Sequence, residues 1–439
     1  MTDFPTAPIR SLRFATLVTV LALLAACGSK SGLKVPEPRE DASIPDGGPP
    51  PIFDADVPPP PVDVCIELPP REPPEFVDAR FVARIASADV LFLVDVTGSM
   101  VEEIEQIRRS LSEVIAPALA TEIPDVHLAV AELADFPASP YGDPERDVPF
   151  RMITRSTADV RVAQAGVADL ANRSGNDVPE SQVEALFQVA TGRGIRGFVN
   201  PASCPAGTVG YPCFRGDGAR IVLLFTDAEF HNGPGDYAPY ERTLLGVQPA
   251  SYPQAVEALN GIGAKVLGLY SGGDFRGSTA LRHLEQIARD TGAVTVDEAG
   301  VETPLVVDIG MNGERLGRGV VDLVRTLVVE VPIDIDAVVE DWPGDAIDAG
   351  ELVRSIQTTG ARPADGAQDL GDRYARVRPG TDVGFRVFLA NERIERGPEP
   401  QEYYLTVVLR GDLVTRLRET NVKVVIPSID GRGCEETVD

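Results

Sequence analysis

Histidine, cysteine, tryptophan and basic side chains are all scarce in this chain of 439 residues. It has 3 histidines, 5 cysteines and 1 tryptophan, and its 40 lysines and arginines are outnumbered by 67 aspartates and glutamates, for a net charge of −27. The shortage of positive charge excludes a nucleic-acid partner, because a phosphate backbone would be repelled. The few histidines and cysteines leave little material for a zinc site or for histidine-based catalysis.

The first 27 residues have the pattern of a bacterial export signal. Arg10 and Arg13 precede an apolar run over residues 14–26, which is shorter than the ~20 residues of a transmembrane helix. The run ends in Leu-Ala-Ala-Cys at Cys27, which resembles the lipobox of bacterial lipoproteins. That resemblance implies cleavage after residue 26 and a lipid on the Cys27 thiol, and Gly28 resembles an outer-membrane sorting signal. The alternative is an ordinary signal peptide with an incidental cysteine.

We therefore expect an exported protein that is attached to the bacterial outer membrane through its lipid anchor alone, on the periplasmic or the outer surface. Residues 27–75 are expected to be an acidic linker, because 14 of the 41 residues from Val35 to Glu75 are proline. Proline fixes φ and removes a backbone donor, so this stretch favours a stiff spacer of ~3.1 Å per residue.

The four remaining cysteines are an even number, which in an exported protein favours disulfides. Four cysteines allow three pairings. Cys204 and Cys213 flank a short loop rich in proline and glycine, so we predict that they pair, which leaves Cys65 to pair with Cys434. A zinc site is the alternative, but no histidine accompanies these cysteines.

Apolar runs alternate with helical patterns between residues 88 and 328. Residues 90–94 are continuously apolar, as in a strand buried on both faces, and apolar residues then recur every three or four positions from Met100 to Ala120, as in a helix. Further strands are predicted at 126–131, 221–225, 265–270 and 293–296, and helices at 180–190, 253–261, 279–291 and 316–327. The alternation predicts an α/β domain with a doubly wound, mostly parallel, Rossmann-like sheet.

The pattern changes after residue 328. Strand-like runs at 329–337, 383–390, 404–410 and 421–427 are separated by turn-rich segments without a helical period. Residues 329–430 are therefore predicted to be a second, all-β domain of sandwich type, followed by a tail at 431–439. Residues 76–87 are expected to add a strand to it.

A candidate metal site follows the first buried strand of the α/β domain. Asp95, Thr97 and Ser99 offer one carboxylate and two hydroxyls from one loop, just before a helix. Oxygen ligands without histidine or cysteine suit Mg²⁺, Mn²⁺ or Ca²⁺. Neutral hydroxyl ligands leave the ion with residual positive charge, so a carboxylate from outside can complete its coordination.

Four segments in order resemble the von Willebrand factor A domain, and most closely the I-like domain of integrin β subunits. Asp-Val-Thr-Gly-Ser at 95–99 resembles the metal-ion-dependent adhesion site. Gly-Asn-Asp-Val-Pro-Glu at 175–180 resembles that family's Gly-Asn-x-Asp-x-Pro-Glu, one residue shorter, and the segments at 135–141 and 224–231 resemble two others. In that family the domain is inserted into a β-sandwich, an arrangement that the expected all-β unit and the Cys65–Cys434 pair resemble.

The resemblance implies three cation sites. The central ion, Mg²⁺ or Mn²⁺, would be bound by Asp95, Thr97, Ser99, Glu180 and Asp227, partly through water. An adjacent site, which in the family uses two aspartates, has Glu102 and Glu103 at those positions. A third would use Asp135, Asn176, Asp177, the carbonyl of Pro179 and Glu180, and Ca²⁺ is the ion expected at these two flanking sites.

The implied function is binding, not catalysis: the central ion would hold an Asp or Glu carboxylate of a protein partner, without a small-molecule substrate. A Mg²⁺-dependent phosphotransferase with Asp95 as the nucleophile is the enzymatic alternative, for which Lys265 is a candidate lysine. A structural A domain without metal is another. His231 is expected to form local hydrogen bonds, and His283, on a helix among charged neighbours, is expected to be exposed.

Overall fold

The computed structural model describes residues 58–272, 278–297, 299–345 and 347–434. The predicted signal segment and residues 27–57 of the predicted linker, Cys27 included, lie outside the described residues. The expectation that the linker extends to residue 75 is wrong, because its described part contains β1 (Val64–Glu67), which pairs with another strand. Among the residues described, no helix is long and apolar enough to cross a membrane.

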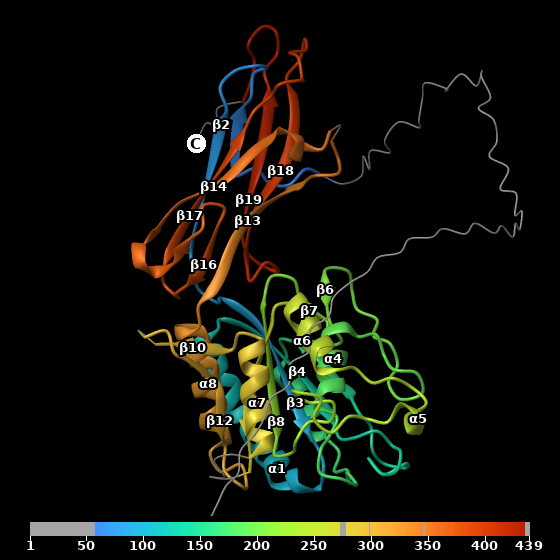
Figure 1. Ribbon diagram of the computed structural model, residues 1–439. Coiled ribbons are helices and arrows are strands. Elements are labelled where there is room, and N and C mark those ends of the chain that lie inside the picture. The colour runs from blue at the N-terminus through green and yellow to red at the C-terminus, as the bar shows by residue number, and fades with distance from the viewer. Residues whose placement is uncertain (1–57, 273–277, 298, 346, 435–439) are drawn as a thin grey trace, which may run out of the picture. The chain divides into compact units, whose positions relative to one another are not determined.

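Six strands form one mostly parallel sheet (Figure 1). Neighbouring strands are parallel except at one edge, where β5 runs antiparallel to β4. In spatial order the strands are β12 (Val306–Asp308), β9 (Ala264–Tyr270), β8 (Ala219–Thr226), β3 (Ser87–Asp95), β4 (Asp125–Leu133) and β5 (Arg151–Thr157). After β3, the next strands along the chain, β4 and β5, are added on one side of it. The later strands β8, β9 and β12 are then added in turn on its other side.

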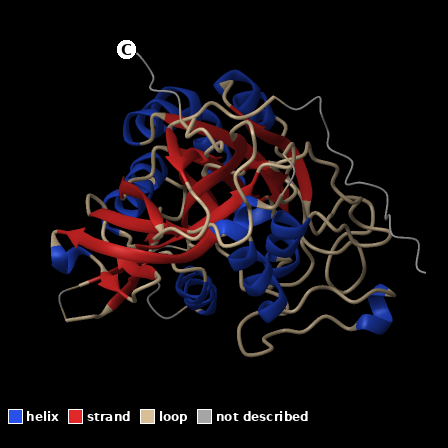
Figure 2. Ribbon diagram, turned by 90° about the horizontal axis from the view of Figure 1, so that it is seen from above, coloured by secondary structure: helices blue, strands red, loops and turns tan. Residues whose placement is uncertain are grey.

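Helices cover both faces of this sheet (Figure 2). Val90, Phe92 and Val94 of β3 pack with one group of helices, whereas Leu91 and Leu93 pack with the other, because side chains alternate along a strand. The first group is α1 (Val101–Ser110), a π-helical turn (Leu111–Ile115), α2 (Ala116–Glu122), α3 (Val160–Ala168) and α8 (Leu316–Glu330). The second group is α4 (Gln182–Thr191), α6 (Tyr252–Gly261) and α7 (Thr279–Asp290). The prediction of a mixed α/β fold with a parallel sheet is confirmed.

The edges of the sheet differ from the sequence prediction. The run at 293–296 was expected in the main sheet, but β10 (Val294–Val296) pairs with β11 (Glu302–Pro304), and the main-sheet edge is β12. The sequence prediction also missed β5 and α3. Edge strands bury less apolar surface than central ones, so their sequences carry a weaker hydrophobic signal.

Two further sheets enclose one hydrophobic cluster, which includes Val77, Ile335, Tyr374, Phe385 and Val424. One has the order β1 (Val64–Glu67), β19 (Thr415–Ile426), β18 (Gln401–Gly411), β13 (Ile333–Asp341), β16 (Arg373–Val377) and β15 (Gln368–Asp369). The other has the order β14 (Val353–Arg362), β17 (Asp382–Leu389) and β2 (Glu75–Val82). The independence of this part as a second domain stays a prediction.

The described part of the chain contains two disulfides, and both are the pairs predicted from the sequence. Cys65, in β1, is bonded to Cys434, and Cys204 is bonded to Cys213 within a loop that also contains β6 (Thr208–Val209). Because Cys65 and Cys434 are 369 residues apart, their bond ties the start of the described chain to its end. Disulfides persist in oxidising compartments, so they fit an exported protein.

Candidate metal centre

The candidate metal ligands lie at the carboxyl ends of the parallel strands. Asp95 is the last residue of β3, and Asp227 directly follows β8. β3 and β8 are paired neighbours from which the chain builds outward in opposite directions, so the point between them is the topological switch point of the sheet. Ligands of open α/β sheets bind at such a point.

Asp95 is buried and is oriented by hydrogen bonds to both carboxylate oxygens. Its Oδ1 accepts from the backbone N–H of Thr97 at 3.0 Å and from the Thr97 hydroxyl at 2.7 Å. Its Oδ2 accepts from the hydroxyl of Thr226, at the end of β8, at 2.7 Å. These donors fix the carboxylate at the junction of the two strands.

Ser99 and Asp227 form the solvent-accessible side of this group. The Ser99 hydroxyl donates to Asp227 Oδ1 at 3.0 Å. Ser99 is exposed and Asp227 is half-buried, whereas Asp95 and Thr97 are buried below them. A molecule in solution therefore reaches the centre from the side of Ser99 and Asp227.

Glu180 belongs to the same group although it comes from another loop. A backbone bridge ties it to the loop after β8: its N–H donates to the Glu229 carbonyl, and its carbonyl accepts from the N–H of His231, both at 2.8 Å. A Cβ placed on Gly175 would lie only 2.3 Å from Glu180 Oε1 and 3.3 Å from Thr97 Cγ2. Gly175 has a φ of +60°, which favours glycine, and its missing side chain leaves room for the Glu180 carboxylate on the side of Thr97.

The electrostatics of the group are those of closely spaced, buried carboxylates. Burial, and next the charge of Asp227, raise the pKa of Asp95 to about 6. Burial, and then the charges of Asp95 and Asp135, raise the pKa of Glu180 to about 11. Glu180 Oε2 is buried without a hydrogen-bond partner among the residues that the structure describes. Such an oxygen is costly unless something positive binds it, and carboxylates with hydroxyls are the donors that Mg²⁺ and Mn²⁺ accept.

The two glutamates expected to form the adjacent site differ in how far they are buried. Glu102 is exposed at the start of α1, whereas Glu103 is buried and neither of its carboxylate oxygens has a hydrogen-bond partner in the described part of the chain. Burial raises the pKa of Glu103 to about 7, with a further contribution from the charge of Asp227. The structure therefore brings Glu103, but not Glu102, into the interior beside the central group.

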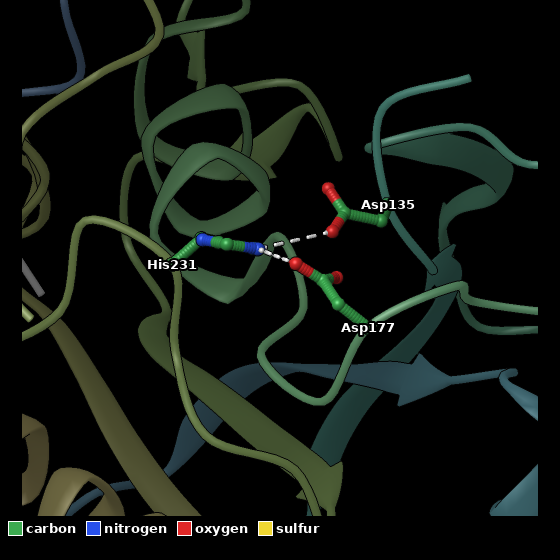
Figure 3. Close-up of side chains that lie close together, drawn as sticks. All are labelled: Asp135, Asp177 and His231. Carbon is green, nitrogen blue, oxygen red and sulfur yellow. Dashed lines mark hydrogen bonds and ion pairs between the residues drawn. The ribbon is translucent and has the colours of Figure 1, made fainter. Parts of the chain in front are cut away.

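The residues expected to form the third site are brought together only in part. Asp135, two residues beyond β4, and Asp177 lie close to each other and to His231 (Figure 3), and these three form a group that could hold a metal ion. Asn176 is exposed, and its backbone N–H donates to the Tyr141 carbonyl at 2.8 Å. The participation of His231 was not foreseen, although it lies four residues after Asp227 in a motif already singled out.

The expectation that His283 is exposed is wrong. Its side chain, on α7, is buried, and its Nδ1 accepts the backbone N–H of Phe230 at 3.1 Å. Its ring also contacts the rings of Phe230 and Tyr237. The sequence prediction relied on the charged neighbours of His283. Adjacent residues of a helix point in different directions, so charged neighbours do not show that His283 is exposed. His283 thereby supports the loop that carries Asp227 and His231.

Replacing His283 with leucine is expected to reduce the free energy of unfolding by about 1–3 kcal/mol, because the buried N–H of Phe230 loses its acceptor. Burial lowers the pKa of His283 to about 4 from its ordinary 6.5, so the folded protein binds fewer protons than the unfolded chain between these values. Its contribution is therefore present above pH 6.5 and is lost as the pH falls towards 4.

Denaturant unfolding at pH 7 and pH 5 measures both effects. Gln286→Leu, at an exposed position of the same helix, is the control and should be close to wild type at both values. An unchanged free energy of unfolding in His283→Leu would contradict the supporting role.

No family model matches the chain in sequence, and no curated protein matches it. Among solved structures the chain is similar to a von Willebrand factor type A protein from Catenulispora acidiphila, with 13% identity and a TM-score of 0.35, over 83% of this chain and 72% of that one. It is similar to proximal thread matrix protein 1 from the mussel byssus, with 14% identity and a TM-score of 0.33, over 59% and 51%. It is also similar to the pilus adhesin SpaC from Lactobacillus rhamnosus GG, with 11% identity and a TM-score of 0.32, over 80% and 45%. All three likenesses are remote.

Proposed function

We propose that this protein is a metal-ion-dependent adhesion module of the von Willebrand factor A type, closest to the integrin I-like domain. In this proposal a divalent cation, Mg²⁺ or Mn²⁺, lies at the switch point of the sheet and binds an Asp or Glu carboxylate of a protein partner. The four ordered sequence motifs support it. So does the strand order, in which β3 is central and the one antiparallel pair lies at the edge.

The observation that carries the proposal is the buried, unpaired oxygen of Glu180 beside a set of oxygen donors. Glu180 is 3% exposed and close to Thr97, and the charge of Asp95 raises its pKa. Asp95 in turn is electrostatically coupled to Asp227, which accepts a hydrogen bond from Ser99. The group thus has three carboxylates and two hydroxyls but no basic side chain among these residues. A divalent cation offsets two of the three negative charges that these carboxylates carry when they are ionised.

The five donors would contact the ion from a buried side and an accessible side. Asp95, Thr97 and Glu180 are buried and would hold the ion from below, whereas Ser99 and Asp227 are accessible and would lie where a partner arrives. When bound, the ion supplies the positive charge that attracts the partner's carboxylate. The hydroxyls of Thr97 and Ser99 add no negative charge, so they weaken that attraction less than two further carboxylates would.

The remaining parts of the proposal concern the setting of this module. We infer a lipid anchor at Cys27 and an outer-membrane location, with the proline-rich linker as a spacer and the two β-sheets as a hybrid-like second domain. The lipobox-like sequence, the two disulfides and the hydrophobic cluster between the sheets support these inferences.

The phosphotransferase alternative gains no support from Lys265. Lys265 is paired in register with Ile221, which is paired with Val90, five residues before Asp95 in β3. At ~3.3 Å per residue the lysine is therefore about 16 Å along the strands from Asp95, towards the opposite end of the sheet. The direct assay is phosphatase activity with Mg²⁺, which this alternative requires to disappear in Asp95→Asn.

Binding is tested by capture of envelope proteins on the immobilised protein. We expect capture in Mg²⁺ or Mn²⁺, elution by chelator, and competition by a short Glu-containing peptide but not by its Gln-containing analogue. Asp95→Ala should capture nothing, whereas Glu113→Ala, an exposed carboxylate on the π-helical turn, should behave as wild type. Capture that survives chelator, or that the two peptides reduce equally, would contradict the proposal.

A further inference from the structure

Three side chains from three separate loops converge on one point beside the central group (Figure 3). Asp135 follows β4, Asp177 precedes α4, and His231 follows β8. His231 Nε2 lies 3.1 Å from Asp177 Oδ2 and 3.5 Å from Asp135 Oδ2. One ligand atom from each residue lies within 4.8 Å of the other two.

The hydrogen bond of the other ring nitrogen of His231, Nδ1, determines whether Nε2 is a donor or an acceptor. Nδ1 lies 2.6 Å from the carbonyl oxygen of Ala238. A carbonyl oxygen only accepts, so Nδ1 carries the proton and the neutral ring has its lone pair on Nε2. That lone pair faces two carboxylate oxygens, which are also acceptors. The three atoms therefore need something positive between them, either a proton on Nε2 or a metal ion.

A proton alone would leave two carboxylate oxygens of this group without a hydrogen-bond partner. A proton on Nε2 would form a hydrogen bond mainly with Asp177 Oδ2, the nearer of the two carboxylate oxygens. Asp135 Oδ2 and Asp177 Oδ1 would stay as they are, both buried and without a hydrogen-bond partner within the described ranges. An ion bonded to neighbouring ligands at about 2.0–2.2 Å holds them about 2.8–3.6 Å apart. The distances from His231 Nε2 to Asp177 Oδ2, 3.1 Å, and to Asp135 Oδ2, 3.5 Å, lie in that range.

The surroundings also resemble those of a metal-binding histidine. Such a histidine commonly donates its second ring N–H to a backbone carbonyl, as His231 does to Ala238. Asp135 Oδ1 is held by the Phe136 N–H and by the Tyr240 hydroxyl, which leaves Oδ2 to face the ring. The Tyr240 ring lies 4.2 Å from the His231 ring, centre to centre, and encloses this side. The Asp177 side chain, 31% exposed, gives an ion a way in.

We propose that Asp135, Asp177 and His231 form a second cation site, which binds a divalent transition-series ion such as Zn²⁺ or Co²⁺. One imidazole nitrogen with two carboxylates favours these ions, whereas Ca²⁺ and Mg²⁺ prefer oxygen alone. The site therefore differs from the all-oxygen Ca²⁺ site that the sequence resemblance implied. It goes beyond the proposed function and does not depend on an ion at the central group.

The bound ion would join the loop after β4 to the segment that leads to Glu180 and to the loop after β8. Asp177 is three residues before Glu180, whose backbone already pairs with that of His231 and Glu229. The second site would thus stabilise the loops that present the central donors.

The experiment is a Co²⁺ titration of the full-length protein, without a histidine tag, in a large enough excess of Mg²⁺ to keep the central group occupied by Mg²⁺, because oxygen ligands also bind Co²⁺. Visible absorption reports the coordination, and proton NMR reports a paramagnetically shifted imidazole N–H, which is simple to assign because the chain has 3 histidines. We expect one Co²⁺ per chain, displaced by Zn²⁺ but not by Ca²⁺. His231→Gln should weaken Co²⁺ binding by about 100-fold or more, since loss of even an outer partner of a ligand costs about 10–100-fold.

Two controls separate this site from the central one. His127→Gln, on β4, and Asp95→Ala should leave Co²⁺ binding unchanged, and His231→Gln should retain Mg²⁺ binding at the central group. Asp177→Asn, at a partly exposed loop position, repeats the test should His231→Gln fold poorly. Absence of Co²⁺ binding, binding that survives both ligand substitutions, or binding lost in Asp95→Ala alone would overturn the second site. Failure of Mg²⁺ binding with Co²⁺ binding intact would overturn only the proposed function.

Discussion

Asp95→Ala is expected to lower the affinity of the protein for Mg²⁺ by about 100-fold or more while the fold is retained. Asp95 is the buried carboxylate at the switch point of the sheet, and hydroxyls of Thr97 and Thr226 orient it there. A hard divalent ion gains most of its binding energy from charged oxygen ligands, so the loss of this carboxylate cannot be compensated by the neutral hydroxyls. Calorimetric titration with MgCl₂ measures the change.

Glu113→Ala is the matched control, because it removes an exposed carboxylate that lies outside the central group. It lowers the net negative charge by the same amount, so any general electrostatic effect on Mg²⁺ affinity appears in both variants. Equal losses in Asp95→Ala and Glu113→Ala would mean that Mg²⁺ is attracted by overall charge and not held by a built site.

The stability of the protein in chelator is expected to fall as the pH rises from 7 to 9, and saturating Mg²⁺ should remove most of this fall. Glu180, with its pKa raised to about 11, binds a proton in the folded ion-free protein, whereas in the unfolded chain it is ionised above its ordinary value of 4.5. The folded state therefore binds more protons, and the free energy of unfolding decreases with pH by up to about 1.4 kcal/mol per pH unit for one such group.

Burial also raises the pKa of Asp135 well above its ordinary range, so its slope has the same sign, and Glu180→Gln isolates the part that comes from Glu180. Three other groups contribute little in this pH window. Glu103, with a pKa of about 7, adds to the slope only in its lower part, Asp95 at about 6 has lost most of its proton, and His283 is neutral in both states. With Mg²⁺ bound, the carboxylates are ionised in the folded protein and the difference in bound protons disappears.

Thermal unfolding at several pH values, in chelator and in Mg²⁺, gives the two curves. Glu180→Gln, which is neutral at every pH, should reduce the slope in chelator and should bind Mg²⁺ weakly. Parallel curves with and without Mg²⁺ would show that no ion binds at Glu180.

The sequence was sufficient to predict the central strands and the loops at their carboxyl ends. The apolar run at 90–94 is typical of a strand buried on both faces, and this predicted the place of Asp95 at the carboxyl end of that strand. The two disulfides also followed from the spacing of four cysteines. The edge strands β5 and β12 could not be predicted in this way, because most of their residues are only half-buried and such segments carry little periodic hydrophobic signal.

The side-chain environments in the site were harder to predict than the backbone. His231 meets Asp135 and Asp177 across gaps of 96 and 54 residues, and only the folded loops bring them together. Similarly, Glu102 and Glu103 are neighbours in sequence, but one is exposed and the other is buried, because consecutive residues of a helix point about 100° apart. Pairings of this kind depend on tertiary structure and leave no local pattern.

Crystals grown with Mn²⁺, with anomalous diffraction data collected near the manganese edge, would test the central claim most directly. We predict an anomalous peak bonded to the Ser99 hydroxyl, with Asp95, Thr97, Glu180 and Asp227 bound to it directly or through water. A map without a peak at this point, at a Mn²⁺ concentration that saturates binding in solution, would contradict the account. A peak at His231 alone would support the second site and leave the proposed adhesion site without its ion.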